Sequence, residues 1–337
     1  MGCISAKKKF FNENRTEFPR GFMKELSING VKIRPGQSVN IEIPIAKLPT
    51  HTLIDLPIFI RSAKEPGPVV LITGGVHGDE INGIVTARRI LDEIDAGLDL
   101  LLGTVIIIPL VNIYGFLSNS RTFPDGRDLN RSFPGSKKGS LAGQIAYILS
   151  EEIIPQIDLG IDFHTGGRML ANQPQVRVDF KDKKAWKLAE VFGTYYVVNS
   201  KLIDKSFRKT AYSAGKQLIV FEGGESMRID ELSTDEGVAG TKRILHHLGM
   251  IEENPERRET IVLKESSWIR AKSSGIFNAS VKAGDQVKKG QILARITDPY
   301  GQIKIPVKAP SDGHIIGLNN LPVINVGEAL IHLGKEG

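Results

Sequence analysis

The sequence predicts an α/β fold, in which a mixed, largely parallel sheet is covered by helices on both faces, followed by a small all-β barrel-sandwich domain. From residue 69 to about 250, apolar strand-like segments alternate with amphipathic helix-like segments, which is typical of an α/β sheet. After about residue 258 the pattern changes to short strands separated by Gly and Pro turns. A chain of 337 residues, 41% of them hydrophobic, is long enough for two or three domains.

Three regions are expected: a β-rich lead-in over residues 1–50, a main α/β domain over 51–257, and the all-β domain over 258–337. In the lead-in and just after it, alternating apolar and polar residues predict strands at 38–43 and 56–60. In the main domain the spacing of apolar residues predicts strands at 69–73, 104–109, 157–164, 195–198 and 217–222, and helices at 81–96, 141–154, 183–192 and 237–248.

The all-β domain contains a weak internal repeat. Gly275 and Gly290 recur as Gly313 and Gly327, each followed by apolar residues, at an offset of 37 to 38 residues. Two similar halves are therefore predicted to pack into one small barrel or sandwich. This domain is expected either to shield the mouth of the active site or to form the interface of a homo-oligomer.

Charge and composition limit the function classes. The net charge is +6 and the pI about 9.2, but Lys and Arg are scattered, with no basic helix, which disfavours nucleic acid and favours small anionic substrates. The apolar runs are far shorter than the roughly 20 residues that span a bilayer, so no membrane segment is expected. Residues 1–9 are interpreted as a disordered basic leader without a secretory signal, and Cys3 is the single cysteine, so a cytoplasmic location is expected.

The most informative motif joins a predicted strand to a predicted helix. It contains His77 and Glu80, and a second predicted strand ends at His164. Two imidazoles and one carboxylate are a ligand set that holds zinc and leaves a position open for water. Glu222 also lies at the carboxyl end of a predicted strand, the edge where α/β sheets bind ligands.

Between these ligand candidates lies a loop bounded by Pro and Gly that carries Arg121, Arg127, Asn130 and Arg131. A guanidinium offers a planar fork that matches a carboxylate, so this loop is predicted to bind an anionic substrate. Asp128, in the same loop, is expected to orient a metal-binding histidine or a neighbouring arginine.

At this point the chain resembles the succinylglutamate desuccinylase/aspartoacylase family, a branch of the zinc carboxypeptidase-like hydrolases. The matching motifs cover about residues 65 to 250 in the order of the family. They are Gly75-Val76-His77-Gly78-Asp79-Glu80, Val111-Asn112 with Gly115-Phe116, Asp128-Leu129-Asn130-Arg131 with Phe133, Asp162-Phe163-His164, and Phe221-Glu222-Gly223-Gly224.

The resemblance implies that residues 51–257 form a zinc hydrolase domain with one zinc per chain, bound by His77, Glu80 and His164. It implies that Glu222 is the general base and acid. It further implies that Asn130 and Arg131 hold the free carboxylate of the substrate and that Arg121 or Arg127 polarises the scissile carbonyl. Arg121 is favoured, because the stretch that contains Arg127 looks longer than in better known members.

Other charged residues and histidines are not assigned to the catalytic site. Glu225 is a rival base that is less favoured than Glu222, and Arg208 is expected to have a surface role. The remaining histidines show no ligand spacing and are treated as structural; they are His51, His246, His247, His314 and His332.

These observations predict a zinc-dependent amide hydrolase that deacylates a small N-acylated amino acid or related compound. A carboxypeptidase acting on peptides or cell-wall fragments, and a non-catalytic binding protein on the same fold, are the alternatives. The acyl group and the amino acid depend on the shape of the pocket, which loops such as 166–177 are expected to set.

Overall fold

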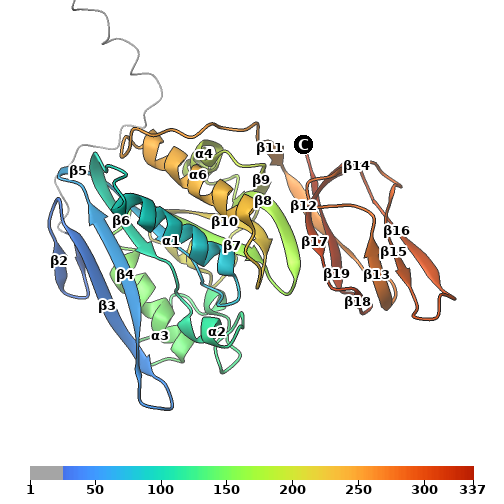
Figure 1. Cartoon of the computed structure of the whole chain (residues 1–337), viewed down its shortest axis with the longest axis horizontal. Coiled ribbons are helices and arrows are strands. Elements are labelled where there is room, and N and C mark those ends of the chain that lie inside the picture. The colour runs from blue at the N-terminus through green and yellow to red at the C-terminus, as the bar shows by residue number, and fades with distance from the viewer. Residues whose placement is uncertain (1–25) are drawn as a thin grey trace, which may run out of the picture.

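The computed structural model describes residues 26–337; the predicted basic leader and Cys3 lie outside them (Figure 1). Its framework is a 13-stranded sheet whose centre is parallel. Four strands form this centre in the spatial order β10 (Gln217–Glu225), β7 (Leu159–Gly166), β5 (Glu65–Thr73) and β6 (Leu102–Ile108). Apart from polar residues near their ends, these strands are mostly apolar, because both of their faces are buried.

Antiparallel strands extend the sheet beyond β6. β4 (Leu53–Ser62) pairs with β6, and β3 (Ser38–Lys47) pairs with β4. In β3 the buried residues are Ile41, Ile43 and Ile45, so one face packs on the core while the other meets solvent. The predicted strands at 38–43 and 56–60 are confirmed. β1 (Leu26–Ile28) and β2 (Val31–Ile33) form a separate two-stranded sheet.

Successive side chains of the central strands point to opposite faces of the sheet, and each face packs into its own hydrophobic core. In β5, Leu71 packs into one core, whereas Val70 and Ile72 pack into the other. The core that holds Ile72 is covered by α1 (Ile81–Asp95), α4 (Lys183–Phe192) and α6 (Glu231–His247). The opposite core is covered by α3 (Leu141–Ile148), its π-helical continuation η2 (Leu149–Ile153), and α5 (Phe207–Ser213). The predicted fold class is confirmed.

The largest difference from the prediction concerns residues 166–177, which were expected to be a loop. They contain most of β8 (Leu170–Val178), which pairs antiparallel with β10 and parallel with β9 (Tyr196–Asn199). Its polar residues hid the strand pattern. Gln175 is fully buried; its Nε2 donates hydrogen bonds to the backbone oxygens of Ile316 at 3.0 Å and Gln173 at 3.2 Å, while its Oε1 has no partner among the described residues.

Several helical segments also differ from the expectation: α5 was not predicted, and the helix expected at 141–154 continues as the π-helical η2 after Ile148. α6 begins at Glu231 rather than Gly237, because the Asp230 side chain accepts a hydrogen bond from the Ser233 amide and caps the helix. The short helix α2 (Ile113–Leu117) was not predicted; the Asn112 side chain caps it in the same way through the Gly115 amide. Among residues 26–337, no helix combines the length and the apolarity that a bilayer crossing requires.

The C-terminal β domain lies at the end of the molecule opposite β3 (Figure 1). Its first long strand, β12 (Glu265–Arg270), continues the main sheet through β19 (Ala329–Lys335) and β17 (Gly313–Asn319), and β17 pairs with β8. β11 (Ile261–Leu263) pairs with β9, and β14 (Gln286–Val287) with β17. A second sheet faces these strands across a shared apolar core; it contains β16 (Lys304–Lys308), β15 (Ile292–Thr297), β13 (Gly275–Ala279) and β18 (Val323–Ile324). The limits of the three predicted regions stay predictions.

The turn between β5 and α1 is packed against the loop that contains α2, and Gly78 lies at the contact. A side chain at this position would overlap the backbone of Gly115 and Phe116. Only a residue without a Cβ atom permits this approach, so Gly78 fixes the path of the turn that carries His77 and Glu80.

Replacing Gly78 with Ala should lower the free energy of unfolding by about 3 kcal/mol, because the new methyl group must displace backbone atoms. Urea denaturation of the variant measures the change. Gly143→Ala is a matched control on helix α3, since its Cβ would make only ordinary contacts, with Ser140 Oγ at 3.4 Å and the backbone nitrogen of Ser136 at 3.9 Å. Equal stability of Gly78→Ala and the wild type would show that the two loops are not packed in this way.

Candidate active site

The candidate site lies at the carboxyl ends of three neighbouring parallel strands. β7 lies between β5 and β10, with Asp162 beside Thr73 of β5 and His164 beside Glu222 of β10. His77 and Glu80 follow β5 in the turn that leads into α1. The pairing of parallel strands therefore brings together residues that are far apart in the sequence.

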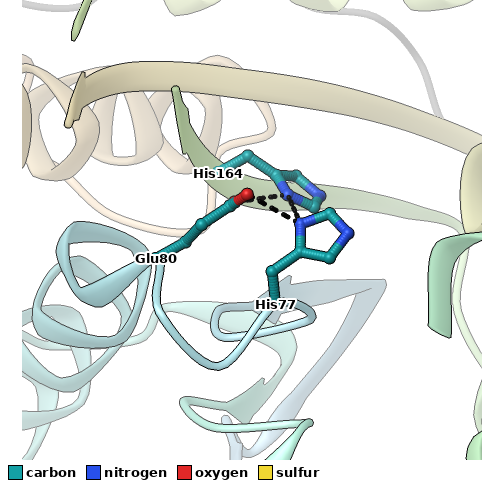
Figure 2. Close-up of side chains that lie close together, drawn as sticks. All are labelled: His77, Glu80 and His164. Carbon is teal, nitrogen blue, oxygen red and sulfur yellow. Dashed lines mark hydrogen bonds and ion pairs between the residues drawn. The ribbon is translucent and has the colours of Figure 1, made fainter. Parts of the chain in front are cut away.

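His77, Glu80 and His164 converge on one point (Figure 2). His77 Nδ1 lies 2.8 Å from Glu80 Oε1, His164 Nδ1 lies 2.8 Å from Glu80 Oε2, and the two Nδ1 atoms are 3.2 Å apart. All three side chains are buried, and their ligand atoms lie within 4.8 Å of one another. This group can hold a metal ion.

The outer nitrogen of each imidazole is held by an aspartate. His77 Nε2 lies 3.1 Å from Asp128 Oδ1, and His164 Nε2 lies 2.8 Å from Asp162 Oδ2, while Asp162 Oδ1 accepts a hydrogen bond from Thr73 Oγ1 at 2.7 Å. An Nε2–H group that donates to a carboxylate leaves the Nδ1 lone pair free to face inward. The donor set and its outer partners therefore fit zinc.

The triad and its neighbours attract positive charge strongly. Burial opposes protonation of His164, but the negative charges of Asp162 and Glu80 outweigh it and raise the pKa of His164 well above its ordinary value. Burial favours a neutral Glu80, yet His77 and His164 hold the pKa of Glu80 well below its usual range. The carboxylates of this centre therefore favour positive charge beside them, either on the imidazoles or on a bound cation.

Arg121 and Asp128 connect this centre to the loop of arginines. Arg121 Nη1 donates to Glu80 Oε1 at 3.0 Å, and its Nε and Nη2 donate to Asp128 Oδ2 at 3.2 and 3.1 Å. Asp128 thus contacts both His77 and Arg121, the two kinds of partner expected from the sequence. Burial would raise the pKa of Asp128, but the His77 hydrogen bond and the charge of Arg121 hold it well below its usual range.

The other residues of that loop fall into two groups. Asn130 and Arg131 line the pocket; Asn130 Oδ1 also accepts a hydrogen bond from the Phe207 amide at 2.9 Å and thereby anchors α5. Arg127 does not line the pocket, because its turn projects into solvent and its side chain, 65% exposed, pairs with Asp125. Of the two arginines considered for the carbonyl, Arg121 is therefore the one beside the triad.

Glu222 is oriented by two residues of β8. Asn172 Nδ2 donates to Glu222 Oε2 at 2.6 Å, and Arg177 Nη1 lies 3.2 Å from Glu222 Oε1. Neither residue was identified from the sequence, because residues 166–177 were taken as a loop; the alternation in Val176-Arg177-Val178 was the available signal. Glu225, the rival base, does not line the pocket; its Oε2 accepts a hydrogen bond from Asn320 at 2.7 Å.

A cavity of about 260 Å³ extends from the triad past Glu222. Arg208 lines it, so the surface role expected for this residue was wrong. Arg208 is buried, and it donates to the backbone oxygens of Arg177, Ser200 and Lys201 at 2.8 to 3.0 Å. Burial and the nearby charge of Arg177 lower the pKa of Arg208 to about 10. Trp268, from the C-terminal β domain, also lines the cavity.

Comparison with known proteins agrees with this architecture. The profile of the succinylglutamate desuccinylase/aspartoacylase catalytic domain matches residues 66–248. The chain is 29% identical to an N-alpha-acetyl-L-2,4-diaminobutyric acid deacetylase of Halomonas elongata, over 82% of this chain and 84% of that protein. The product-bound structure of the ectoine utilization protein EutE (DoeB) of Ruegeria pomeroyi superposes with a TM-score of 0.80, at 26% identity, covering 93% of this chain and 99% of that one. A succinylglutamate desuccinylase/aspartoacylase of Rhodobacter sphaeroides has the same fold, with a TM-score of 0.79 at 24% identity over 90% of this chain and 96% of that one.

Arg208→Met should lower the free energy of unfolding by about 2 kcal/mol. Methionine fills a similar volume but leaves buried backbone oxygens without a donor, and this cost exceeds the gain from removing a buried charge. Arg127→Met is the control, because its exposed pair with Asp125 contributes at most about 1 kcal/mol. Thermal unfolding of both variants measures the difference, and equal melting temperatures would contradict the structural role of Arg208.

Proposed function

Because this chain belongs to the succinylglutamate desuccinylase/aspartoacylase family, we propose that it is a zinc-dependent hydrolase that cleaves the linear amide bond of a small N-acylated amino acid. The observation that carries the proposal is the buried triad of His77, Glu80 and His164 next to Glu222 on the neighbouring strand. The similarity to a deacetylase of N-acetyl-diaminobutyric acid supports an N-acylated amino acid as the substrate class.

In the proposed site, His77, His164 and Glu80 would hold the zinc ion, since their ligand atoms converge on one point. When bound, zinc would supply a Lewis acid and lower the pKa of a water molecule to about 7. Asp128 and Asp162 accept hydrogen bonds from the Nε2–H groups of the two rings, which fixes the ring planes and turns the Nδ1 lone pairs toward the centre of the triad.

Glu222 is proposed to move the proton. Its carboxylate takes a proton from the attacking water and later delivers it to the nitrogen of the departing amine. Asn172 and Arg177 each engage one carboxylate oxygen, and both belong to the paired strand β8, so the carboxylate is held in one orientation. Each oxygen keeps a second lone pair with which it can accept the proton.

Arginines of the pocket are proposed to receive the negative charges of the substrate. Arg121, 31% exposed and fixed by Glu80 and Asp128, donates to the carbonyl oxygen as negative charge develops on it. Asn130 and Arg131 line the same pocket and would bind the free carboxylate. Arg208 adds positive charge without an acidic side chain bonded to it, which favours an anionic substrate.

The proposal is tested by incubating zinc-loaded protein with N-acetyl amino acids, N-succinyl amino acids and dipeptides, and measuring the released amine. Turnover of the N-acyl amino acids supports it. Turnover of dipeptides alone would identify a carboxypeptidase, and no turnover of any substrate by zinc-loaded protein would favour a binding protein on this fold.

Glu222→Gln should lower kcat by about 10²- to 10⁴-fold, because an amide cannot accept the proton of the attacking water. Bound zinc, measured by elemental analysis, should not change, since Glu222 is not one of the three ligands. Glu225→Gln is the matched control on the same strand and should keep kcat within a few-fold. A larger loss in Glu225→Gln than in Glu222→Gln would reverse the assignment of the base.

Asp162→Asn should lower the affinity for zinc by about 10- to 100-fold, because the neutral amide orients His164 less well and no longer increases its basicity. Competition with a chromophoric zinc chelator measures the affinity directly. Asp95→Asn, which removes a carboxylate that pairs with Arg61 elsewhere, should bind zinc like the wild type. Unchanged affinity in Asp162→Asn would show that this aspartate does not orient a ligand.

A further inference from the structure

Trp268 is the one residue of the C-terminal β domain that lines the active-site pocket in the described structure. We propose that Trp268 determines which amino acid side chains the pocket accepts, because its indole packs against the aliphatic side chain of the N-acyl amino acid. This inference rests on the proposed function and deepens it, since it assigns the substrate side chain a binding surface on a different domain.

Paired residues of neighbouring strands link Trp268 to Asn172, the residue that contacts Glu222. Trp268 of β12 is paired with His332 of β19, His332 with Gly317 of β17, and Gly317 with Asn172 of β8. Directly paired residues project to the same face of a sheet. Asn172 in turn donates its hydrogen bond to Glu222. One row of residues across four strands therefore runs from Trp268 to the proposed base.

Because Gly317 has no side chain, its neighbours in this row, Asn172 and His332, can lie close to it. A Cβ atom at this position would lie 2.8 Å from Asn172 Oδ1 and 3.2 Å from the Cβ of His332. The missing side chain therefore leaves room for Asn172 beside Glu222 and for His332 behind Trp268. A larger residue would push the two side chains apart.

The indole of Trp268 stacks on the imidazole of His332. Its ring and the ring of His332 are stacked, with centroids 4.5 Å apart and planes inclined by 11°. Burial, together with the charge of Arg177, lowers the pKa of His332 to about 3, so this imidazole is neutral at physiological pH. Because His332 covers one face of the indole, the surface that Trp268 offers to the pocket is its other face and its edge.

Trp268 supplies the largest apolar surface in a pocket that is otherwise rich in charge. The other apolar residues of the wall are the smaller Leu170, Ile203 and Val220. In the proposed binding mode the arginines bind the substrate carboxylate and the triad lies at the scissile amide. The part of the substrate without a polar partner is the side chain of the amino acid, and burying it against an indole is favourable.

The test compares the kcat/KM values of zinc-loaded wild type, Trp268→Ala and Trp268→Phe with N-acetylglycine, N-acetylalanine, N-acetylnorvaline and N-acetylnorleucine. Trp268→Ala should lose about 10-fold or more with the two long side chains, mainly through KM, and less than about 2-fold with N-acetylglycine, which has no side chain to pack. Trp268→Phe should recover most of the loss. Trp186→Phe is the control, because Trp186 packs on Phe180 outside the pocket.

Equal losses with N-acetylglycine and with the long substrates would overturn this inference while leaving the proposed function intact. If the wild type hydrolyses none of the substrates, it is the proposed function that fails. A second measurement does not require Trp268→Ala to fold: the chain has two tryptophans, so Trp268 is the single fluorophore of its type in Trp186→Phe. Saturable change of its emission with norleucine, and none with glycine, supports the inference; no change with either contradicts it.

Discussion

The parallel pairing of β7 between β5 and β10 is the constraint on which the rest of the site depends. It places His164 beside Glu222 and Asp162 beside Thr73, and it sends the chain after β5 into the turn that carries His77 and Glu80. A shift of one residue in this register would direct these side chains to the opposite face. The apolar residues that alternate between the two cores prevent such a shift, so packing far from the site maintains its geometry.

Charge balance explains why so many acidic groups are gathered at one buried place. Glu80, Asp128 and Asp162 contact the two imidazoles, and Arg121 contacts two of these carboxylates. With neutral imidazoles, three negative charges and one positive charge leave a net charge of −2, which a divalent cation balances. Uncompensated buried charge is costly, so without a metal the same carboxylates favour protonated imidazoles, which agrees with the raised pKa values of His77 and His164.

Much of this site could be predicted because the carboxyl ends of parallel strands lie at the same edge of the sheet, and the sequence shows where each strand ends. Apolar runs in the sequence predicted strands that end at His164 and Glu222. Because both strands were expected to be parallel, these two residues were also expected at the same edge of the sheet. β8 could not be recognised, because Asn172, Gln173 and Gln175 interrupt its alternation and Pro174 disfavours a strand. Arg208 was misjudged for a related reason: its burial depends on backbone oxygens of other segments, which no local pattern displays.

The continuity of the sheet through β17 and β8 changes what the C-terminal domain can do. If this domain were attached by a linker alone, Trp268 would be free to move relative to Glu222. Instead, three hydrogen-bonded strands, β19, β17 and β8, lie between β12 and β10 at fixed spacings, and the side chain of Gln175 bonds to β17 as well. A substitution in the β domain that shifts β17 therefore acts on Asn172 and, through it, on the orientation of Glu222. The backbone hydrogen bonds between β17 and β8 therefore hold the β domain, and with it Trp268, in a fixed position at the wall of the pocket.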